Sequence, residues 1–550
     1  MTPPDALVVA KQTLLVLSPE LLLLLVATVM MTAGAFVTLP RRVWAGATAG
    51  ALVAAMVALF MLRNETTDPY SSVALNDALS GYARFAFLLT GLILLGLAHD
   101  QVDDSRAAEF FGAFLMIHAG AMLVAASNEL VFLFVGLELV SIPTYLLLYL
   151  PRRNATTQEA ATKYFFLSIF SSGLLLFGLA YLYGLAGVSN LKALSYLIHW
   201  FSNSLPLPEP QLAVIALVFV MAGLGFRVAA VPFHWYAPDV YEGSPTVMAA
   251  LLAWVPKGVG FLALIRVLSA VFGWERGDLH ASEMSNLSQV SDKAAFLAGL
   301  IAIITMTLGN TVALRQDNLK RLFAYSSIAH AGYMMVGLAA AFRNSPTTSG
   351  GFLGTEGILL YLATYALMTL GALGVIIALS TRDRPVETVD DLSGLAWTHP
   401  TAALAMGLCL FSLAGVPPMA GFYGKFWIFG SALAVAKGPD ARGFQLLTII
   451  GVLNAAIGAY YYLRILMKMT FSPAPARPLM PRPSWAAILA VGACASLSLG
   501  LGLITAPLVN ASHQAAISAV ATPEVLSVAP AKSTAIMRER ERPAAGAVRR

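Results

Sequence analysis

The sequence predicts an all-α, polytopic membrane protein of about fourteen transmembrane helices, and three observations support this fold class. Of the 550 residues, 58% are hydrophobic and only 11% are charged, whereas soluble domains contain roughly 25% charged residues. A helix needs about 20 apolar residues to cross a bilayer, and runs of this kind follow one another along most of the chain. The runs are continuous, which excludes the alternating pattern of a transmembrane β-barrel.

Apolar windows bounded by charged residues, or by Pro and Gly, define the helices in chain order. The seventh window contains Pro232, and the twelfth contains Pro417 and Pro418. Proline removes a backbone donor and clashes with the preceding turn, so we predict that helices 7 and 12 are discontinuous. The fourteen windows are 19–37, 43–62, 83–99, 107–126, 129–150, 159–184, 211–235, 245–270, 293–314, 319–341, 356–380, 400–435, 444–469 and 484–508.

The two interrupted helices lie five windows apart, which predicts two copies of one five-helix unit at 107–271 and 292–470. Because five is odd, the second copy enters the membrane from the opposite face, as in the inverted repeats of many transporters. Helices 1–3 occupy 1–106, and helix 14 occupies 484–508. The segment 511–550 is rich in Ala, Ser, Pro and Arg without a sustained apolar period, so we predict that it is disordered.

The distribution of basic residues predicts how the chain is oriented. Loops that follow odd-numbered helices carry more Lys and Arg than the loops of the opposite face, which favours a cytoplasmic location for them. The first apolar run lacks a basic leader and an evident cleavage site, so we interpret it as a retained helix. The absence of an Arg- and Ser-rich presequence favours the plasma (inner) membrane of a bacterium over an organelle.

Several classes of chemistry are excluded. Cys409 and Cys494, the two cysteines, both lie in apolar runs and cannot supply the four ligands that an iron–sulfur cluster needs. Nucleotide-binding glycine motifs and the zinc-protease motif are absent from the sequence. The net charge of +5 reflects loop placement in a membrane chain rather than nucleic-acid binding. We therefore expect no cofactor or metal in this chain, and a lipid bilayer rather than nucleic acid around it.

Ionisable residues inside the apolar windows are the strongest functional signal. A charge at the bilayer centre costs about 2.5–3.5 kcal/mol on insertion scales, so it persists where it is paired, hydrated or functional. Glu138 stands near the middle of helix 5, Lys257 is central in helix 8, and Lys425 follows the break in helix 12. A nearby counter-charge can switch a buried lysine between its protonated and neutral forms, which a proton relay requires. The alternative for Glu138 is a structural ion pair that only pins helices together.

For three further basic residues in the windows we predict different roles. Lys163 lies one turn inside helix 6, where a relay role and snorkelling to the interface both stay open. Arg266 lies close to the end of helix 8, where snorkelling is favoured. Arg227 cannot lose its proton, so it can serve as a fixed counter-ion but not as a proton carrier.

Histidines complete the set of candidates, because neutral imidazole both donates and accepts a hydrogen bond. His234 adjoins the break in helix 7, and His330 lies in a Tyr- and Ser-rich stretch of helix 10. For both, a relay role and a satisfied core histidine remain open. For His118 the core role is favoured.

Three segments together resemble a known family: GLGFRVAAVPFHWYAPDVYEGSP, LRQDNLKRLFAYSSIAHAGY and FSLAGVPPMAGFYGKFWIF. In sequence and order they are similar to the antiporter-like membrane subunits of proton-pumping NADH:quinone oxidoreductase (respiratory complex I), and PDVYEGSP with SSIAHAGY resembles the subunit N branch. The resemblance implies a fourteen-helix proton channel that has no redox cofactor of its own. It also implies packing against other membrane-arm subunits, both antiporter-like paralogues and small membrane subunits. NADH, FMN, iron–sulfur clusters and quinone are used by the assembled complex.

By matching positions, Glu138, Lys163, Lys257 and Lys425 resemble the family's ionisable residues of helices 5, 6, 8 and 12. Arg227 departs from the pattern, because the family usually has lysine there as partner of the helix-5 glutamate. The implied function is proton translocation: protons dwell on Lys257, pass His330 and leave through Lys425, while the Glu138–Arg227 pair modulates Lys257. The alternatives are a subunit of a multisubunit cation/proton antiporter and a non-pumping membrane scaffold.

Overall fold

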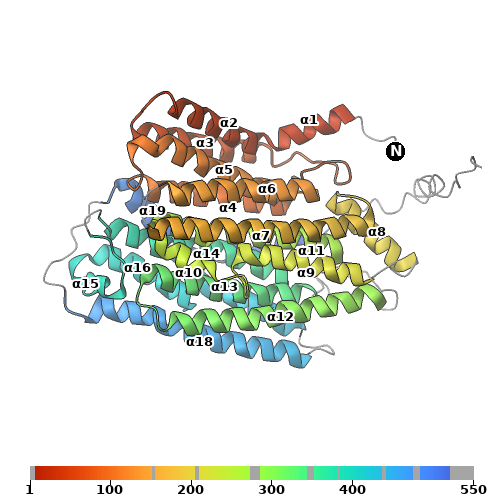
Figure 1. The fold of residues 1–550 in the computed structure, drawn as a ribbon. Helices are drawn as coiled ribbons and strands as arrows, with labels where there is room; N and C mark the ends of the chain where they lie inside the picture. Colours follow the sequence, from red (N-terminus) through yellow and green to blue (C-terminus); the bar gives the residue numbers. More distant parts are fainter. Residues whose placement is uncertain are drawn as a thin grey trace, which may run out of the picture. The chain divides into compact units, whose positions relative to one another are not determined.

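The computed structural model describes residues 6–150, 155–204, 210–272, 285–343, 352–381, 384–435, 441–474 and 483–520. Within these residues the fold is all-α, with three isolated β-bridges and no strand. Figure 1 shows the long helices running roughly parallel, with α2 and α3 at one edge of the bundle and α12 and α18 at the other.

The N-terminal part contains four helices, and the first predicted unit contains seven. They are α1 (Ala6–Val16), α2 (Ser18–Gly34), α3 (Arg41–Met61), α4 (Ala78–Ala98), α5 (Ala107–Ala126), α6 (Leu130–Tyr149), α7 (Ala155–Ala186), α8 (Leu191–Ser204), α9 (Pro210–Val228), α10 (Tyr236–Gly243) and α11 (Thr246–Phe272). The remaining α-helices are α12 (Ser285–Ala313), α13 (Leu319–Ala341), α14 (Gly354–Leu379), α15 (Leu395–Thr398), α16 (Pro400–Ala414), α17 (Ala420–Val435), α18 (Ala441–Phe471), α19 (Trp485–Leu503) and α20 (Ala506–Val520). Two short 3-10 helices, η1 (Asp104–Arg106) and η2 (Val389–Leu392), lie in loops.

Each of the fourteen predicted windows overlaps a helix or a pair of helices. Among the described residues, twelve helices are long and apolar enough to cross a membrane, and α1 with α2 forms a thirteenth candidate bent by 67°. The remaining window, 400–435, holds α16 and α17, which contain 15 and 16 residues and are each too short to span alone. The prediction of an all-helical, polytopic membrane fold is confirmed.

Both predicted breaks are present. Helix α9 ends at Val228 and α10 begins at Tyr236, whereas α16 ends at Ala414 and α17 begins at Ala420. At the second break Gly415 adopts φ +85°, a left-handed conformation that glycine adopts without the steric cost of a Cβ. Helix breaks within the membrane are tolerated where other protein groups bind the backbone N–H and C=O groups that the break leaves unpaired. In transporters such breaks lie at ion or substrate sites, so we expect functional residues at these two breaks.

The prediction of disorder from residue 511 onward is wrong for 511–520, because α20 continues to Val520. The helix is held by packing: Ala515 and Ala516 are fully buried, and the Ser518 hydroxyl accepts a hydrogen bond from the Leu79 amide at 2.9 Å. Alanine favours helix but adds little hydropathy, which explains why an apolar-window search passes over this segment. The rest of the predicted disordered tail, 521–550, lies outside the described residues.

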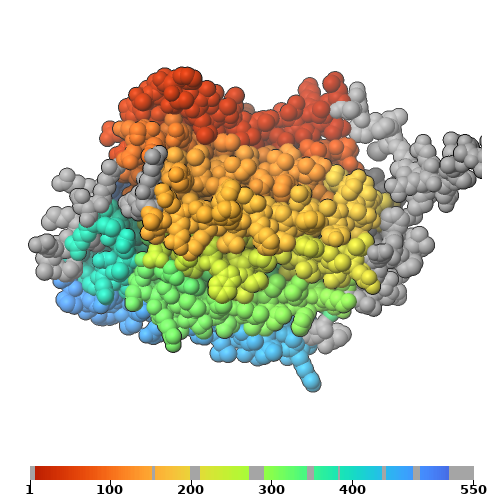
Figure 2. All heavy atoms as spheres, in the orientation of Figure 1, coloured from red at the N-terminus to blue at the C-terminus, as the bar shows by residue number. Residues whose placement is uncertain are grey.

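Two of the most deeply buried helices, α11 and α13, carry the candidate residues Lys257 and His330. In their most apolar windows, 100% of the residues of α11, 94% of α13 and 89% of α14 are buried, against 39% for α3, α7, α12 and α18. The space-filling view shows the outer helices following one another in chain order across one face, from red α2 and α3 to blue α18 (Figure 2). Polar groups on α11, α13 and α14 are therefore separated from the surroundings by the outer apolar helices.

Candidate functional site

The first element of the site is an ion pair between α6 and α9. Arg227, 3% exposed in the last turn of α9, places Nη2 3.0 Å from Oε1 of Glu138. Its Nη1 donates to the Ser141 hydroxyl at 2.6 Å and to the Leu137 carbonyl at 3.1 Å, and the Ser172 hydroxyl donates to the Glu138 carboxylate at 2.5 Å. The expected pair is thus formed, and hydroxyls and a carbonyl satisfy much of its remaining hydrogen-bonding capacity.

Lys257 lies in the middle of α11 and is 1% exposed. Its Nζ donates to both the backbone carbonyl and the hydroxyl of Ser327 on α13, and it lies 5.3 Å from the centre of the Tyr365 ring. No acidic side chain among the described residues forms an ion pair with this ammonium group. Dipoles and an aromatic face, rather than a fixed anion, therefore surround the charge, so Lys257 is not locked in its protonated form.

A second row of hydrogen bonds runs through the centre of the protein beside Ser327, and among the described residues no hydrogen bond joins this row to Ser327. The adjacent residue, Ser326, shares a hydrogen bond with the hydroxyl of Tyr462 on α18, and this hydroxyl lies 2.9 Å from Nε2 of His330. Nδ1 of His330 lies 2.6 Å from the hydroxyl of Tyr361 on α14. His330 is 1% exposed, and its imidazole on α13 links α14 and α18 through two hydroxyl groups. A relay and a satisfied core histidine both fit this arrangement, so the relay role stays a prediction.

Lys425 lies beyond the far end of this row, at the break between α16 and α17. Its Nζ donates to the carbonyls of Leu413 and Ala414 at 2.8 and 2.9 Å, two of the last carbonyls of α16, which the break leaves without helical partners. A Cβ added at Gly424, the residue before Lys425, would fall 2.1 Å from the Tyr361 ring. Tyr361, the last member of the hydrogen-bonded row, therefore packs directly beside the backbone that carries Lys425.

Two predicted residues lie away from these rows. Lys163 forms ion pairs with Glu159 at 2.7 Å and with Asp239 of α10 at 2.6 Å, and its side chain is 39% exposed. Arg321, at the start of α13, lies 3.0 Å from the same Asp239 carboxylate. Burial alone raises the pKa of Asp239, but hydrogen bonds from Lys163 and Arg321 hold the pKa below its usual value. Lys163 thus belongs to a half-exposed charged cluster, and the structure does not bring it to Glu138.

His234 occupies the break between α9 and α10 and is 3% exposed. Its ring lies 4.7 Å from that of Trp235, and its Nδ1 has no hydrogen-bond partner among the described residues. The hydrogen bonds described above do not include it. Its proposed relay role stays a prediction.

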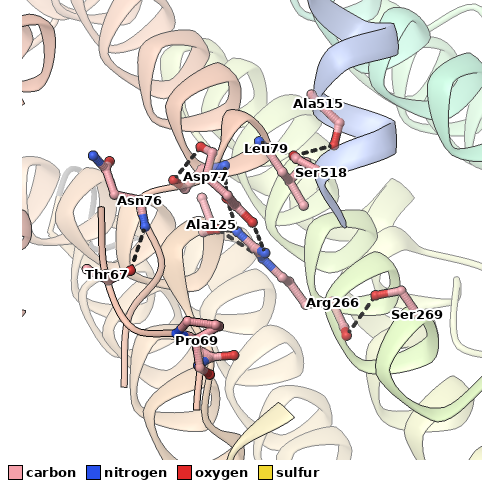
Figure 3. A network of polar contacts seen from close by, with 12 residues as sticks. Thr67, Pro69, Asn76, Asp77, Leu79, Ala125, Arg266, Ser269, Ala515 and Ser518 are labelled. Carbon is pink, nitrogen blue, oxygen red and sulfur yellow. Dashed lines mark hydrogen bonds and ion pairs between the residues drawn. The ribbon is translucent and has the colours of Figure 1, made fainter. Parts of the chain in front are cut away.

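The interpretation that Arg266 snorkels is wrong. The side chain is 4% exposed and forms a two-pronged ion pair with Asp77, with Nη1–Oδ2 and Nη2–Oδ1 distances of 2.6 and 2.7 Å, and it also donates to the Ala125 carbonyl. Figure 3 shows Arg266 of α11 reaching Asp77 at the start of α4. The predicted window began at residue 83, whereas α4 begins at Ala78 and Asp77 caps it, so the partner was missed.

The sequence reasoning also missed a second buried pair. Glu20 of α2 and Arg84 of α4 are both fully buried, and their Oε1 and Nε atoms are 2.7 Å apart. Arg84 stood at the edge of its predicted window and was not counted as an intramembrane charge. The tyrosines of the central row were missed for a different reason: only the packing of α13, α14 and α18 shows that they meet at His330.

Comparison with known proteins places this arrangement in a family. Residues 127–457 match the family described as "NADH:quinone oxidoreductase/Mrp antiporter, TM". The chain is 38% identical to NADH-quinone oxidoreductase subunit N of Paramagnetospirillum magneticum, over 85% of this chain and 89% of the relative.

Two solved structures are similar. A chain of respiratory complex I from Thermus thermophilus with bound aureothin superimposes with a TM-score of 0.69 at 30% identity, covering 89% of this chain and 98% of that one. A chain of the Mrp complex from Dietzia sp. gives a TM-score of 0.76 at 18% identity, covering 93% and 98%, which shows a shared fold. The chain therefore belongs to the family of membrane subunits that NADH:quinone oxidoreductases share with Mrp antiporters.

Proposed function

We propose that this chain is the proton-translocating subunit N of an NADH:quinone oxidoreductase, and that it moves protons across the membrane while other subunits carry electrons from NADH to quinone. The observation that carries the proposal is a pair of adjoining buried polar rows, Lys257 with Ser327, and Ser326 with Tyr462, His330 and Tyr361, the last of which packs beside the backbone of Lys425. The hydroxyl, imidazole and ammonium groups of these rows provide sites where a proton can reside and bonds along which it can move.

In this mechanism a proton rests on Lys257 and passes to the Ser327 hydroxyl. A water molecule carries it to Ser326, from which it continues through the Tyr462 and His330 side chains toward Lys425. Each hydroxyl or imidazole accepts one proton as it releases another, so the groups carry charge only transiently. Lys425, held by the free carbonyls of α16, receives the proton at the second helix break. The two lysines are then the resting positions, and the groups between them form the conduit.

The Glu138–Arg227 pair modulates the affinity of Lys257 for its proton. Gly260 lies one turn beyond Lys257 on α11, and a Cβ placed there would be 3.2 Å from the Cβ of Arg227, so α9 carries its arginine close to the lysine helix. Two unit charges about 10 Å apart interact by about 1.7 kcal/mol at an effective dielectric of about 20. Moving one charge across 100 mV takes about 2.3 kcal/mol. Separation of the pair therefore supplies a large part, but not all, of the free energy that release of one proton against 100 mV takes.

The proposed partners are the other membrane-arm subunits, both antiporter-like paralogues and small membrane proteins, and the proposed location is a bacterial inner membrane. Among the described residues, no group of three or more His, Cys, Asp or Glu side chains is arranged to hold a metal ion. In this proposal NADH, FMN, iron–sulfur clusters and quinone are used by the rest of the complex. Co-purification of flavin and iron–sulfur proteins with the tagged chain would support it, whereas co-purification of antiporter subunits alone would favour the Mrp-type assembly.

The direct test is the Lys425→Ala variant of the assembled complex in sealed vesicles. We expect NADH-driven proton pumping to be abolished, because the second resting position of the proton is lost. Lys468→Ala is the matched control. Lys468 is a half-exposed lysine that pairs with Asp390, and it is not a member of the proposed conduit. The number of protons pumped per NADH oxidised is measured for both variants. A wild-type ratio in Lys425→Ala would refute the proposal and favour a scaffold role.

A further inference from the structure

One buried carboxylate near Lys425 is not used by the mechanism above. Glu356, in the first turn of α14, is 1% exposed. Its Oε1 accepts a hydrogen bond from Nε1 of Trp427 at 2.9 Å, and its Oε2 lies 2.9 Å from Nδ1 of His513 on α20. The His513 side chain is 41% exposed. A buried acid is thus joined by one hydrogen bond to an imidazole that reaches the protein surface.

The packing of α14 on α17 places this carboxylate nearer the start of α14 than Tyr361, the last member of the hydrogen-bonded row. Tyr361 of α14 contacts Gly424, and one turn nearer the start of α14 Gly357 lies against Ile428 of α17. Glu356 precedes Tyr361 by five residues, or about 7.5 Å along a helix axis. Proceeding from His330, the order along α14 is therefore Tyr361 and then Glu356, with His513 hydrogen-bonded to Glu356.

The helix order also assigns this end of the path to one membrane face. Helix α14 begins after the loop that follows the tenth predicted helix, and loops after even-numbered helices are predicted to be non-cytoplasmic. Protons pumped by the chain leave on that face. The position of Glu356 and His513 therefore matches an outlet rather than an entrance.

Helix α20 is a firm support for the imidazole. It docks on α4, where the Leu79 amide donates to Ser518, and its Ala515 and Ala516 are fully buried. Figure 3 shows Ser518 and Ala515 on the blue helix beside the start of α4. The Trp427 hydrogen bond holds the other carboxylate oxygen, so the acid and the imidazole are both oriented by structure.

We propose that Glu356 and His513 form the proton outlet of this chain, by which a proton leaves Lys425 for the non-cytoplasmic face. The inference rests on the proposed pumping function. A water molecule carries the proton from Lys425 to Glu356: an N–H bond of the ammonium group breaks, an O–H bond forms on the carboxylate, and the water is left unchanged. The proton then passes to Nδ1 of His513, regenerating the carboxylate, and the imidazolium releases its Nε2 proton to water. Rotation then turns the exposed ring toward solvent, where Nδ1 gives its proton to water and Nε2 takes one from water, which restores the starting tautomer with no net consumption of a reactant.

Other ionisable groups lie on the helices that pack around α14, and none of them replaces this pair. Lys257 and His330 belong to the conduit, and the hydroxyl of Tyr82 on α4 donates to the Leu359 carbonyl at 3.0 Å. The thiols Cys409 and Cys494 are buried on α16 and α19. Among these groups, His513 alone is both half-exposed and hydrogen-bonded to a buried acid.

The test uses the whole complex in sealed vesicles with Glu356→Gln and His513→Ala. Both variants are expected to lower the protons pumped per NADH at least about tenfold, because a positioned proton-transfer group typically contributes about 10²- to 10⁴-fold to a rate. Imidazole added on the outlet side is expected to restore pumping in His513→Ala, because a free base can replace the missing ring. Pumping is recorded as membrane potential, with the pH gradient collapsed so that the added base does not disturb the reading.

His99→Ala is the matched control, because His99 forms the same contact with a carboxylate, 2.9 Å from Asp100, at the opposite end of α4; it should pump normally. Wild-type pumping in both outlet variants, with Lys425→Ala deficient, would overturn the outlet and leave the proposed function intact. Normal pumping in Lys425→Ala would overturn the function itself. Loss in His513→Ala that imidazole does not restore would show a structural role only and overturn the proposal. If Glu356→Gln fails to assemble, the imidazole result on His513→Ala decides.

Discussion

At the scale of single residues, the site depends on how each charge is compensated. Arg227 is compensated by a carboxylate, hydroxyls and a carbonyl, whereas Lys257 and Lys425 are held by carbonyls, a hydroxyl and aromatic faces. A carboxylate partner fixes a cation in its charged form, while neutral dipoles leave it free to exchange a proton. The arginine is therefore suited to a permanent charge and the two lysines to changing charges.

The residue Arg227 can be tested by restoring the lysine that the family usually carries. In Arg227→Lys, the substituted side chain can lose its proton, which arginine does not do in proteins. We expect near-normal pumping at neutral pH and a steeper loss than in the wild type as the pH rises, because deprotonation leaves Glu138 without its cation. Protons pumped per NADH are measured across the pH range. Parallel profiles for the two proteins would contradict the fixed-charge role, and Arg227→Gln, deficient at every pH, is the control.

At the scale of elements, the sequence predicted the helices and their breaks well and the links between helices poorly. Pro417 and Pro418 predicted the break between α16 and α17, because proline lacks the backbone N–H that a helix needs and clashes with the preceding turn. The same reasoning could not find Tyr462, which reaches His330 only because α13 and α18 pack together. It also missed α20, whose alanines give helix propensity and close packing without a strong apolar run.

The charged cluster that joins α7, α10 and α13 gives a prediction at this scale. Asp239 has a pKa below its usual value because Lys163 and Arg321 offset the cost of its burial. A group whose pKa is lowered by folding adds stability above its unfolded pKa of about 3.9 and loses that stability as the pH falls through the lower folded value. Asp239→Asn should therefore lower the midpoint of thermal unfolding at pH 7.

The expected effect is small, at most about 1 kcal/mol, because the carboxylate is partly exposed and solvent screens it. The difference between variant and wild type should shrink below about pH 4, where the wild-type carboxylate also protonates. Differential scanning fluorimetry of the purified complex provides the measurement. A difference that stays constant from pH 7 to acid would show that packing, rather than charge, accounts for the loss.

At the scale of the whole molecule, the predicted inverted repeat explains why similar features recur in the two halves. The chain makes a β-bridge between Glu129, before α6, and Asn190, after α7, and another between Asn318, before α13, and Thr388. Each bridge joins the segment before the second helix of a predicted unit to the segment after its third, and each unit has a break in its fourth helix. The matching bridges and breaks support the repeat. The inversion itself stays a prediction, because it depends on which membrane face each loop occupies.

Cysteine labelling tests that sidedness with two conservative changes, Ser189→Cys and Ser393→Cys. Both serines are partly exposed and follow the third helix of a unit, and the native thiols Cys409 and Cys494 are buried and so give a low background. An inverted repeat places the two loops on opposite membrane faces, because each unit crosses the membrane an odd number of times. A membrane-impermeant maleimide should therefore label Ser393→Cys from the cytoplasmic face and Ser189→Cys from the other. Labelling of both from one face would contradict the repeat, and labelling on the reversed faces would keep the repeat but turn the predicted outlet at Glu356 into an entrance.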